Sequence, residues 1–381
     1  MKILMSSNAP WSPSGYGVQS KLLIDYFKKN NHDIVFLANY GLVGGQLEHE
    51  DVIYLPDDLG TWGNNLIDFH VMMNKPDLIL SLCDWFVFDH SKWNHLNVPW
   101  INWTPIDLNI NKDFERLNNF IKDCFGIVPM SKFGQSQLEL VNAETLPVIY
   151  HAIDSSIFRI VDKKAARMKS ELPQEPFIIG MVMANKDATE NRKAFDYQFE
   201  AVKQFIDKHQ DLNVMLYLHT EPSEKYNGLN LIEIFKDKKF DLDKVIFTNP
   251  MKLAAYSYSF EQMTYLYNSL DVLMNASSGE GFGIPIIEAQ ACGVPVLTHD
   301  ATSMSELTFY GYAAKSDKKT KKEIIDYGYR FMPSVSDMVK GLEYILENRD
   351  ETKRQETSKF VRENFSIDKI GAQWLDIINK L

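Results

Sequence analysis

Residues 270–294 constrain the fold of this chain more than any other segment. The apolar run 270–276 is typical of a short buried strand, and the Ser-Ser-Gly sequence that follows it ends the strand. Pro285 suits the first turn of a helix and Gly293 suits the position just past its end, so residues 285–292 predict a short helix. A strand, a glycine loop and a helix in this order present backbone N–H groups and a positive dipole end to an anion such as a phosphate.

The same segment carries groups that would not hold a phosphate themselves. Gly281 and Gly283 let the backbone come close to a ligand, whereas Glu280 and Glu288 would repel an anion. Ionised carboxylates accept strong hydrogen bonds from hydroxyl groups. The segment therefore predicts a phosphate site with sugar hydroxyls on both sides.

The order of residues in this segment also resembles a known signature. Glu280 to Glu288 reads Glu-Gly-Phe-Gly-Ile-Pro-Ile-Ile-Glu, and Ala-Cys-Gly-Val-Pro-Val follows at 291–296. This string resembles the signature of family-4 retaining glycosyltransferases of the GT-B fold (glycosyl transferases group 1). The resemblance implies an α/β fold with two Rossmann-like domains, whose parallel sheets face a central cleft. The alternative is a helix capped by acidic residues in an ordinary doubly wound sheet.

The resemblance also implies roles for individual residues. Glu288 would hold the ribose of a nucleotide and Glu280 the transferred sugar. The backbone beside the sugar and phosphate would be that of Gly281, Phe282, Gly283 and Ile284. Asn249, which follows a predicted strand at 245–248, suits the base or its surroundings.

Two cations stand before a predicted helix in the second half of the chain. The loop 184–193 ends in Arg192 and Lys193 and leads into an amphipathic helix. A helix N-terminus disfavours cations, so we expect an anion to compensate them. In the family that the chain resembles, an Arg-Lys pair at this place contacts the diphosphate of the donor, which predicts that Arg192 and Lys193 neutralise the leaving group. The alternative is a pair of ordinary surface cations.

The first half begins with another strand, glycine loop and helix, predicted at 1–5, 6–17 and 18–30, followed by a strand at 34–38. Gly15 and Gly17 suggest the dinucleotide fingerprint, but Ser20 stands where its third glycine belongs, which weakens an oxidoreductase interpretation. The resemblance implies that this loop faces the cleft and contacts donor or acceptor. A plain tight turn is the alternative.

Buried strands are predicted at 77–82, 100–103 and 126–129, and open α/β sheets bind ligands at the carboxyl ends of such strands. Asp84, Asp107 and Ser131 are therefore candidates by position. The sequence 103–107 resembles a loop in which many relatives carry a histidine near the sugar, and Asp107 stands in its place. Its role is left open between catalytic and structural. Most of the aromatic residues between 85 and 103 are interpreted as core.

Length and composition set the outer limits. A chain of 381 residues, 45% of them hydrophobic, predicts two domains, here 1–154 and 155–365, with a terminal helix at 366–381 that packs back on the first domain. The net charge of −11 argues against a nucleic-acid partner. The sequence shows no signal peptide and no transmembrane segment, so we expect a cytoplasmic protein. Five lysines within 315–322 are interpreted as a solvated loop, which an anionic lipid or a polyanionic acceptor could use.

Together with these observations, the resemblance implies a retaining, metal-independent hexosyltransferase of carbohydrate biosynthesis. It would move a sugar from a UDP- or GDP-sugar to a glycan, lipid or small-molecule acceptor, without a cofactor. Asp241-Leu-Asp243 matches a metal-binding motif of other glycosyltransferases, but it precedes a strand instead of following one, so no metal ligand is assigned. Two alternatives stay open: a noncatalytic nucleotide-sugar or glycan-binding module, and a GT-B sugar-nucleotide epimerase or phosphorylase.

Overall fold

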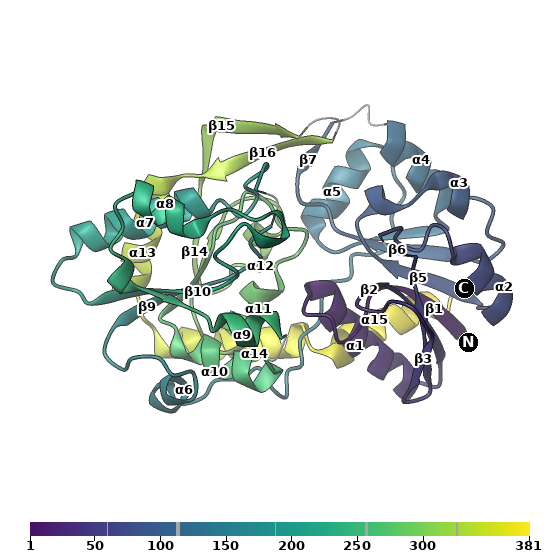
Figure 1. Cartoon of the computed structure of the whole chain (residues 1–381), viewed down its shortest axis with the longest axis horizontal. Coiled ribbons are helices and arrows are strands. Elements are labelled where there is room, and N and C mark those ends of the chain that lie inside the picture. The colour runs from purple at the N-terminus through teal and green to yellow at the C-terminus, as the bar shows by residue number, and fades with distance from the viewer. Residues whose placement is uncertain (59, 112–114, 187, 256–257, 325–326) are drawn as a thin grey trace. The chain divides into compact units, whose positions relative to one another are not determined.

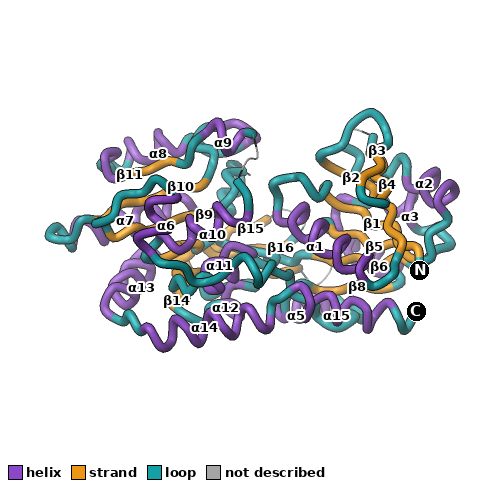
Figure 2. The backbone as a smooth tube through the Cα atoms, turned by 90° about the horizontal axis from the view of Figure 1, so that it is seen from below, coloured by secondary structure: helices purple, strands orange, loops and turns teal. Residues whose placement is uncertain are grey.

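The computed structural model describes residues 1–58, 60–111, 115–186, 188–255, 258–324 and 327–381. The chain divides into two compact units. Unit 1 comprises Met1–Ala152 and Phe365–Leu381, and unit 2 comprises Ile153–Asn364. The division after Ala152 lies close to the boundary that the sequence suggests after residue 154. Both ends of the chain belong to unit 1, where they lie side by side in Figures 1 and 2.

Unit 1 is built on one sheet whose described strands follow the order β3-β4-β2-β1-β5-β6-β8. β3 pairs antiparallel with β4, and the other neighbours run parallel. The residues of β5 and β6 are all buried, which is typical of strands covered on both faces. The bounds are β1 (Lys2–Asn8), β2 (Asp33–Tyr40), β3 (Leu47–His49), β4 (Val52–Pro56), β5 (Leu78–Leu82), β6 (Trp100–Thr104) and β8 (Gly126–Pro129), while β7 (Asn109–Ile110) lies outside this sheet.

Helices cover both faces of this sheet. Figure 1 shows α1 and α15 on one side and α3 and α4 on the other. The bounds are α1 (Gly15–Lys29), α2 (Ile67–Asn74), the short helix η1 (Trp85–Val87), α3 (His90–Trp93), α4 (Glu115–Asp123), α5 (Lys132–Leu140) and α15 (Ile367–Ile378). Trp374 of α15 is fully buried and packs edge-on against Trp103, with 5.2 Å between ring centroids. Gly371 lets α15 approach α1, because a Cβ there would lie 2.4 Å from the ring of Tyr26.

Unit 2 contains a parallel sheet with the described order β11-β10-β9-β12-β13-β14. α7, α8 and α13 cover one face, and α6, α10 and α14 lie on the other (Figure 1). Apolar side chains of β9, β10 and β12 pack against α7, α8 and α13 in the core. The bounds are β9 (Phe177–Val182), β10 (Val214–His219), β11 (Val245–Phe247), β12 (Val272–Asn275), β13 (Val296–His299) and β14 (Gly311–Ala314), with α6 (Lys163–Lys169), α7 (Phe195–Lys208), α8 (Leu231–Asp237), α9 (Pro250–Ala254), α10 (Phe260–Ser269), α11 (Ile284–Ala291), α12 (Met304–Leu307), α13 (Val335–Glu347), α14 (Glu351–Asn364) and the short helices η2 (Lys225–Asn227) and η3 (Leu242–Lys244).

The lysine-rich run corrects one prediction. It is a strand and not a solvated loop: β15 (Ser316–Ile324) pairs antiparallel with β16 (Gly328–Pro333). Lysine has a low strand propensity, but pairing gives its ammonium group an aromatic neighbour, as where Lys321 Nζ lies 4.2 Å from the centre of the Tyr329 ring. The alternation of Tyr329 and Phe331 in β16 was the available signal for this hairpin.

The first helix corrects a second prediction, because it begins at Gly15 instead of residue 18. Ser14 lies in an extended conformation and its side chain accepts a hydrogen bond from the Gly17 N–H, so it forms the N-cap. β1 also runs on to Asn8, which shortens the predicted loop 6–17 to residues 9–14.

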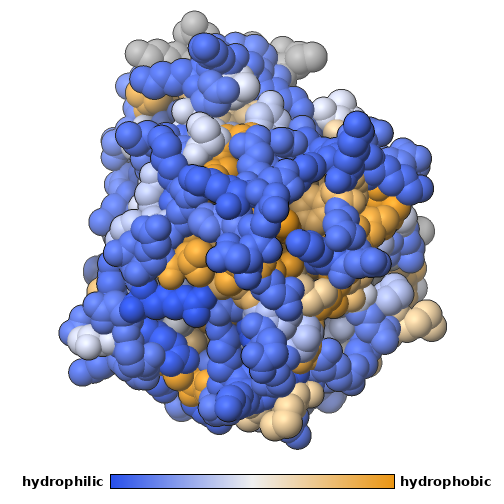
Figure 3. All heavy atoms as spheres, turned by 90° about the vertical axis from the view of Figure 1, so that its left-hand side faces the viewer, coloured by the Kyte–Doolittle hydropathy of each residue, from blue (hydrophilic) through white to orange (hydrophobic). Residues whose placement is uncertain are grey.

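The face of the molecule drawn in Figure 3 is mainly hydrophilic. Hydrophobic residues lie on it in small separate groups. Within the described part of the chain, no helix is both long enough and apolar enough to cross a membrane.

Candidate functional site

The glycine loop of unit 2 leaves the sheet at the carboxyl end of β12. This strand lies between β9 and β13, and its four residues Val272–Asn275 are all buried. The loop ends at Gly283, which is the N-cap of α11 and has a φ of 106°. A side chain is strained at this φ, and a Cβ would lie 2.9 Å from Cδ1 of Ile286. Gly283 therefore lets the loop turn into the helix.

The start of α11 suits an anion. No side chain of the described residues caps this helix, and Pro285 in its first turn has no N–H of its own. Uncapped N–H groups and the helix dipole together favour negative charge at such an end. The backbone at 281–284, predicted to lie beside a phosphate, forms this turn.

Glu280 lies in an ion-paired cluster within the glycine loop. Its Oε1 atom accepts hydrogen bonds from Lys193 Nζ at 2.6 Å and from Ser277 Oγ at 2.6 Å. Its Oε2 atom lies 3.1 Å from Nη1 of Arg192. The side chain of Glu280 is 10% exposed and that of Lys193 is 11% exposed. Among the described residues, Glu280 is an anion that compensates both cations.

The charge of this cluster follows from its contacts. Burial alone would raise the pKa of the Glu280 carboxyl, but the charges of Lys193 and Arg192 and the hydrogen bonds from Lys193 and Ser277 lower it below the usual value. The carboxyl is therefore ionised at neutral pH. Arg192, Lys193 and Glu280 together carry a net charge of +1, which suits an anionic ligand.

The loop that carries the two cations is docked on the glycine loop by hydrogen bonds to backbone carbonyls. The Ser278 N–H donates to the Arg192 carbonyl at 2.8 Å, and Nη1 of Arg192 donates to the Gly279 carbonyl at 3.0 Å. Gln198 of α7 links both segments, since it donates to the Lys193 carbonyl at 2.7 Å and accepts from the Ala276 N–H at 3.0 Å. Of the predicted loop 184–193, Asp187 lies outside the described residues.

Glu288 has a different environment from Glu280. It lies in the second turn of α11, and its Oε2 atom accepts a hydrogen bond from the Tyr267 hydroxyl of α10 at 2.6 Å. Burial raises the pKa of the Glu288 carboxyl to about 7, although the bond from Tyr267 acts in the opposite direction. One motif therefore holds a carboxylate with a lowered pKa and a carboxyl that titrates near neutral pH.

Three further residues hold the glycine loop in place. The Glu280 N–H donates to Thr302 Oγ1 at 3.1 Å, and Ser303 Oγ lies 2.6 Å from the Phe282 carbonyl. Nδ1 of the buried His299 bonds the Ser277 carbonyl at 2.9 Å. The position of Thr302 and Ser303 just after β13 was the signal for them.

In the glycine turn of unit 1, a side chain of the same turn accepts a hydrogen bond from the start of the helix. The Gly17 N–H donates to Ser14 Oγ at 3.0 Å. A Cβ on Gly17 would lie 2.3 Å from the Ser12 carbonyl oxygen, so close packing requires glycine at this position. Gly15 is the exposed first residue of α1. A donor contact of Gly15 and Gly17 stays a prediction.

Acidic residues of unit 1 gather near Tyr16. Its hydroxyl donates to Oδ2 of Asp84 at 3.2 Å. Burial raises the pKa of Tyr16, and the negative charges of Asp84 and, more weakly, Asp107 add to this rise. The loops after β5 and β6 therefore bring Asp84 and Asp107 close to the first turn of α1.

Two other candidates have local structural roles. Asn249 caps α9, since its side chain accepts from the N–H groups of Met251 and Lys252. Ser131 caps α5 in the same way through the Gly134 N–H. A contact of Asn249 with a nucleotide base stays a prediction.

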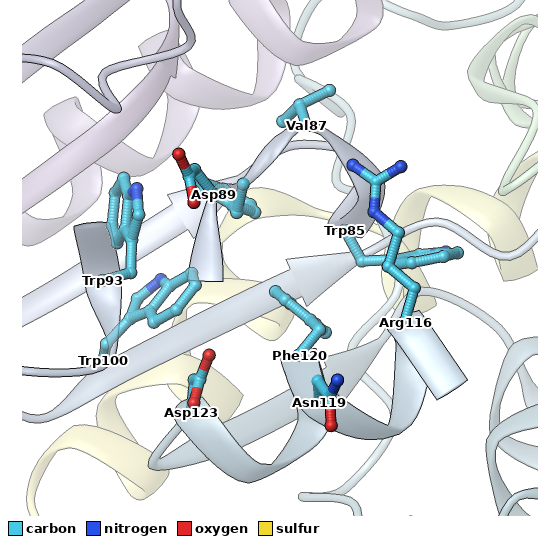
Figure 4. Close-up of a pocket in the computed structure, with 10 residues that line it drawn as sticks. Trp85, Val87, Asp89, Trp93, Trp100, Arg116, Asn119, Phe120 and Asp123 are labelled. Carbon is cyan, nitrogen blue, oxygen red and sulfur yellow. The ribbon is translucent and has the colours of Figure 1, made fainter. Parts of the chain in front are cut away.

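Unit 1 contains a cavity of about 540 Å³ between η1, α3 and α4. Its lining combines aromatic rings with polar side chains: Trp85, Val87, Phe88, Asp89, Trp93, Trp100, Arg116, Asn119, Phe120 and Asp123. Figure 4 shows Phe120, Asn119 and Arg116 along α4, with Trp93 and Trp100 opposite. The rings pack on one another, Trp93 and Trp100 with 4.5 Å between centroids, and five of them are 2 to 7% exposed. They form an aromatic core with little ring surface for a ligand.

Metal ligands are not grouped in the part of the chain that the structure describes: it contains no set of three or more His, Cys, Asp or Glu side chains placed to hold an ion. In the Asp-x-Asp motif, Asp241 accepts from the Asp243 N–H and caps η3.

Comparison with known structures defines the class of fold. The chain is similar over its whole length to sucrose-phosphate synthase from Thermosynechococcus elongatus, with a TM-score of 0.74 at 16% identity and coverage of 100% of this chain and 98% of that one. The Anabaena protein HepE in complex with UDP and glucose gives a TM-score of 0.70 at 13% identity, covering 100% and 99% of the two chains. The protein has the GT-B fold, which confirms the predicted fold class.

Sequence comparison adds a narrower match. Residues 179–324 match the family model of the glycosyl transferases group 1. Uncharacterized glycosyltransferase 335 of Sulfolobus islandicus rod-shaped virus 1 is 21% identical over 273 residues, which cover 69% of this chain and 76% of that protein. Together with the fold, these findings support the superfamily of GT-B glycosyltransferases. The matched segment contains Arg192, Lys193, Glu280 and Glu288.

Proposed function

We propose that this protein is a retaining glycosyltransferase that transfers a hexose from a nucleotide diphosphate sugar to an acceptor hydroxyl. The observation that carries the proposal is the cluster of Glu280, Arg192 and Lys193 just before the uncapped start of α11. A carboxylate that can accept hydrogen bonds from sugar hydroxyls, two cationic side chains and a helix N-terminus lie together there. A sugar joined to a diphosphate needs these three kinds of partner.

The cations and the helix supply the main catalytic effect. When the bond between sugar and diphosphate breaks, negative charge grows on the leaving diphosphate. Arg192, Lys193 and the N–H groups at the start of α11 would stabilise that charge in a site that is already organised by backbone bonds. Because the protein supplies this positive charge, we propose that transfer does not require a metal ion.

The two glutamates would bind the two sugars of the donor. Glu280 is ionised and would accept hydrogen bonds from hydroxyls of the transferred sugar, beside the cations that hold the diphosphate. Glu288 would accept from the ribose hydroxyls in its ionised form. Retention requires no protein nucleophile if the acceptor hydroxyl attacks from the face that the diphosphate leaves. Glu280 then acts by electrostatics and positioning.

Donor binding is the first test. Thermal stability would be measured with UDP, GDP, ADP and their sugar conjugates, starting with UDP-glucose because HepE was solved with UDP and glucose. A ligand at a hundred times its Kd stabilises the folded state by about 2.7 kcal/mol. We expect one base to give this shift. No shift with any nucleotide contradicts the proposal.

Turnover is the second test. The donor that binds would be incubated with acceptor pools in EDTA, and released nucleoside diphosphate would be measured together with the anomeric configuration of the product by NMR. We expect release that depends on acceptor, persists in EDTA and retains configuration. Binding without turnover would indicate a binding module, donor consumption without acceptor an epimerase, and dependence on phosphate a phosphorylase.

A further inference from the structure

The β15–β16 hairpin is an addition to the parallel sheet of unit 2. It follows β14, the last strand of that sheet, and precedes α13. The hairpin is not needed to cover the last strand of the sheet, because α13 packs on β14 directly. The side chains of the hairpin nevertheless contact one loop of the candidate site directly and reach the other through His299.

The first contact is with the loop that carries Arg192 and Lys193. Nη1 of Arg330 in β16 lies 2.7 Å from Oε2 of Glu190, two residues before Arg192. The Arg330 side chain is 7% exposed, so this ion pair is well shielded on the hairpin side. Lys322 of β15 donates to the carbonyls of Thr189, at 3.0 Å, and Glu190. The hairpin therefore holds both the side chain and the backbone at residue 190.

The second contact is with His299 at the end of β13, which bonds the glycine loop. Ser316 Oγ at the start of β15 lies 2.8 Å from Nε2 of His299, whose Nδ1 bonds the Ser277 carbonyl at 2.9 Å. Burial lowers the pKa of His299 to about 4, so the ring is neutral at pH 7. A carbonyl only accepts, so Nδ1 carries the proton and Nε2 accepts from Ser316. Ser277 in turn bonds Glu280.

We infer that the β15–β16 hairpin is a positioning element for the donor site, in which Arg330 and Lys322 fix the loop of Arg192 and Lys193 through Glu190. This inference rests on the proposed function. The two cations are long side chains on a loop. The glycine loop holds them through Glu280 and through the carbonyls of Arg192 and Gly279, and Gln198 of α7 holds the Lys193 carbonyl. The hairpin adds a hold on the same loop at residue 190. Arg330 is thus a positioning residue and touches no reacting atom.

The inference has a measurable consequence. Charged groups that stabilise a transition state lose their effect when they are misplaced by about 1 Å, at a cost of up to about 100-fold in rate. Releasing Glu190 would leave Arg192 and Lys193 in the chain but would widen the range of positions that they sample. The loss would fall on kcat and on kcat/KM together, since a leaving group is stabilised in the transition state.

The test replaces Arg330. Arg330→Gln removes the ion pair with Glu190, and Lys319→Gln is the matched control, because Lys319 is an exposed cation on the same hairpin. We expect R330Q to lower kcat about 10- to 100-fold, to weaken binding of the nucleoside diphosphate, and to speed hydrogen exchange of the amides at 188–193. R330K keeps the charge and should restore most of each quantity. K319Q should behave as the wild type.

The outcomes separate this inference from the proposed function. If the wild type binds no nucleotide and transfers no sugar, the proposed function fails, while hydrogen exchange of 188–193 in R330Q still tests the contact with the hairpin. If the wild type is active and R330Q matches it in kcat, in Kd and in exchange, the inference is overturned. A lower melting temperature of R330Q with unchanged Kd and exchange also overturns it. If R330Q does not fold, Glu190→Gln removes the same pair from its more exposed side and is held to the same three measurements.

Discussion

Two turns of this molecule have the same plan and differ in what surrounds the helix N-terminus. In unit 1, β1 leads through a loop to α1, where the side chain of Ser14 accepts from the Gly17 N–H. In unit 2, β12 leads through a loop to α11, where Gly283 supplies no side chain and charged residues lie before the helix instead. The first helix end is satisfied by its own chain, whereas the second suits a ligand.

The glycines of the two turns answer different needs. Gly17 is required by close packing, since a Cβ would lie 2.3 Å from a backbone oxygen. Gly283 is required by its φ of 106°. A glycine in a strand-loop-helix turn therefore does not mark a phosphate site by itself. The neighbouring cap and charges distinguish the two turns.

The largest effect should come from the charge of Glu280. Glu280→Gln keeps the size of the side chain, and we expect transfer to fall on the order of 100-fold or more, as when a single transition-state partner is removed. Nucleotide binding should persist, because Arg192 and Lys193 remain. Kinetics of nucleoside diphosphate release would measure the first effect and calorimetry the second. Glu261→Gln, on the first turn of α10, is the control. Turnover like that of the wild type in folded E280Q would remove Glu280 from the mechanism.

The titration of Glu288 should give the next largest effect. Its folded pKa of about 7 lies above the ordinary 4.5, so the folded state holds the proton more tightly than the unfolded chain does. The wild type therefore loses stability as the pH rises from 4.5 through 7, by an amount on the order of 3 kcal/mol. Glu288→Gln cannot lose that proton, and its stability relative to the wild type should increase with pH.

Denaturant unfolding of both proteins between pH 5 and pH 8 would measure this difference. By the proposed ribose contact, wild-type nucleotide affinity should rise over the same range as the carboxyl ionises, and E288Q should lose this dependence. Parallel stability curves of the two proteins would contradict the raised pKa. Equal nucleotide affinity at every pH would contradict the ribose contact.

Alanine at each glycine tests the comparison directly. Gly17→Ala should destabilise the protein by about 1 to 3 kcal/mol, because backbone oxygens cannot move aside, and should leave nucleotide affinity unchanged. Gly283→Ala should cost a similar amount through strain at its φ, about 1 to 3 kcal/mol, and should also weaken nucleotide binding. Melting temperature and calorimetry of both variants provide the test. A weaker nucleotide affinity in G17A would favour the predicted donor contact of Gly17 and break the comparison.

The smallest effect concerns the cap of the first turn. Ser14→Ala removes the acceptor for the Gly17 N–H and should lower stability by about 1 kcal/mol. Nucleotide affinity should stay the same. A thermal melt with and without the nucleotide checks both statements. If S14A created a second anion site, binding stoichiometry by calorimetry would rise above that of the wild type.

Much of the fold follows from local patterns in the sequence. The strand predicted at 126–129 agrees with β8, because a buried parallel strand appears in the sequence as an apolar run between loop residues. The start of α1 was misplaced because the cap depends on the conformation of Ser14. The hairpin was missed because lysine content outweighed the alternating aromatic residues of β16. The pairing of β15 with β16 stabilises the lysine-rich strand, and the sequence of that strand taken alone does not reveal its partner.

The candidate site was predictable only where its residues are contiguous in the sequence. The glycine loop and its glutamates are contiguous, so they stand out in the sequence. The contact of Glu280 with Lys193, that of Glu288 with Tyr267 and that of Ser277 with His299 join residues that are far apart in the chain. The pKa of about 7 for Glu288 depends on burial, which no local pattern gives. The roles assigned to these residues stay predictions until the variants are measured.

The return of the chain to unit 1 has a consequence for the order of folding. A ribosome completes unit 2 before it supplies Phe365–Leu381, so unit 1 lacks α15 while unit 2 is already whole. Until then the face of α1 around Tyr26 lacks the backbone of Gly371, and the ring of Trp103 lacks the ring of Trp374 that packs on it. The first unit to be synthesised is therefore the last to be finished, and a chaperone that binds exposed aromatic surface has the whole synthesis of unit 2 in which to act.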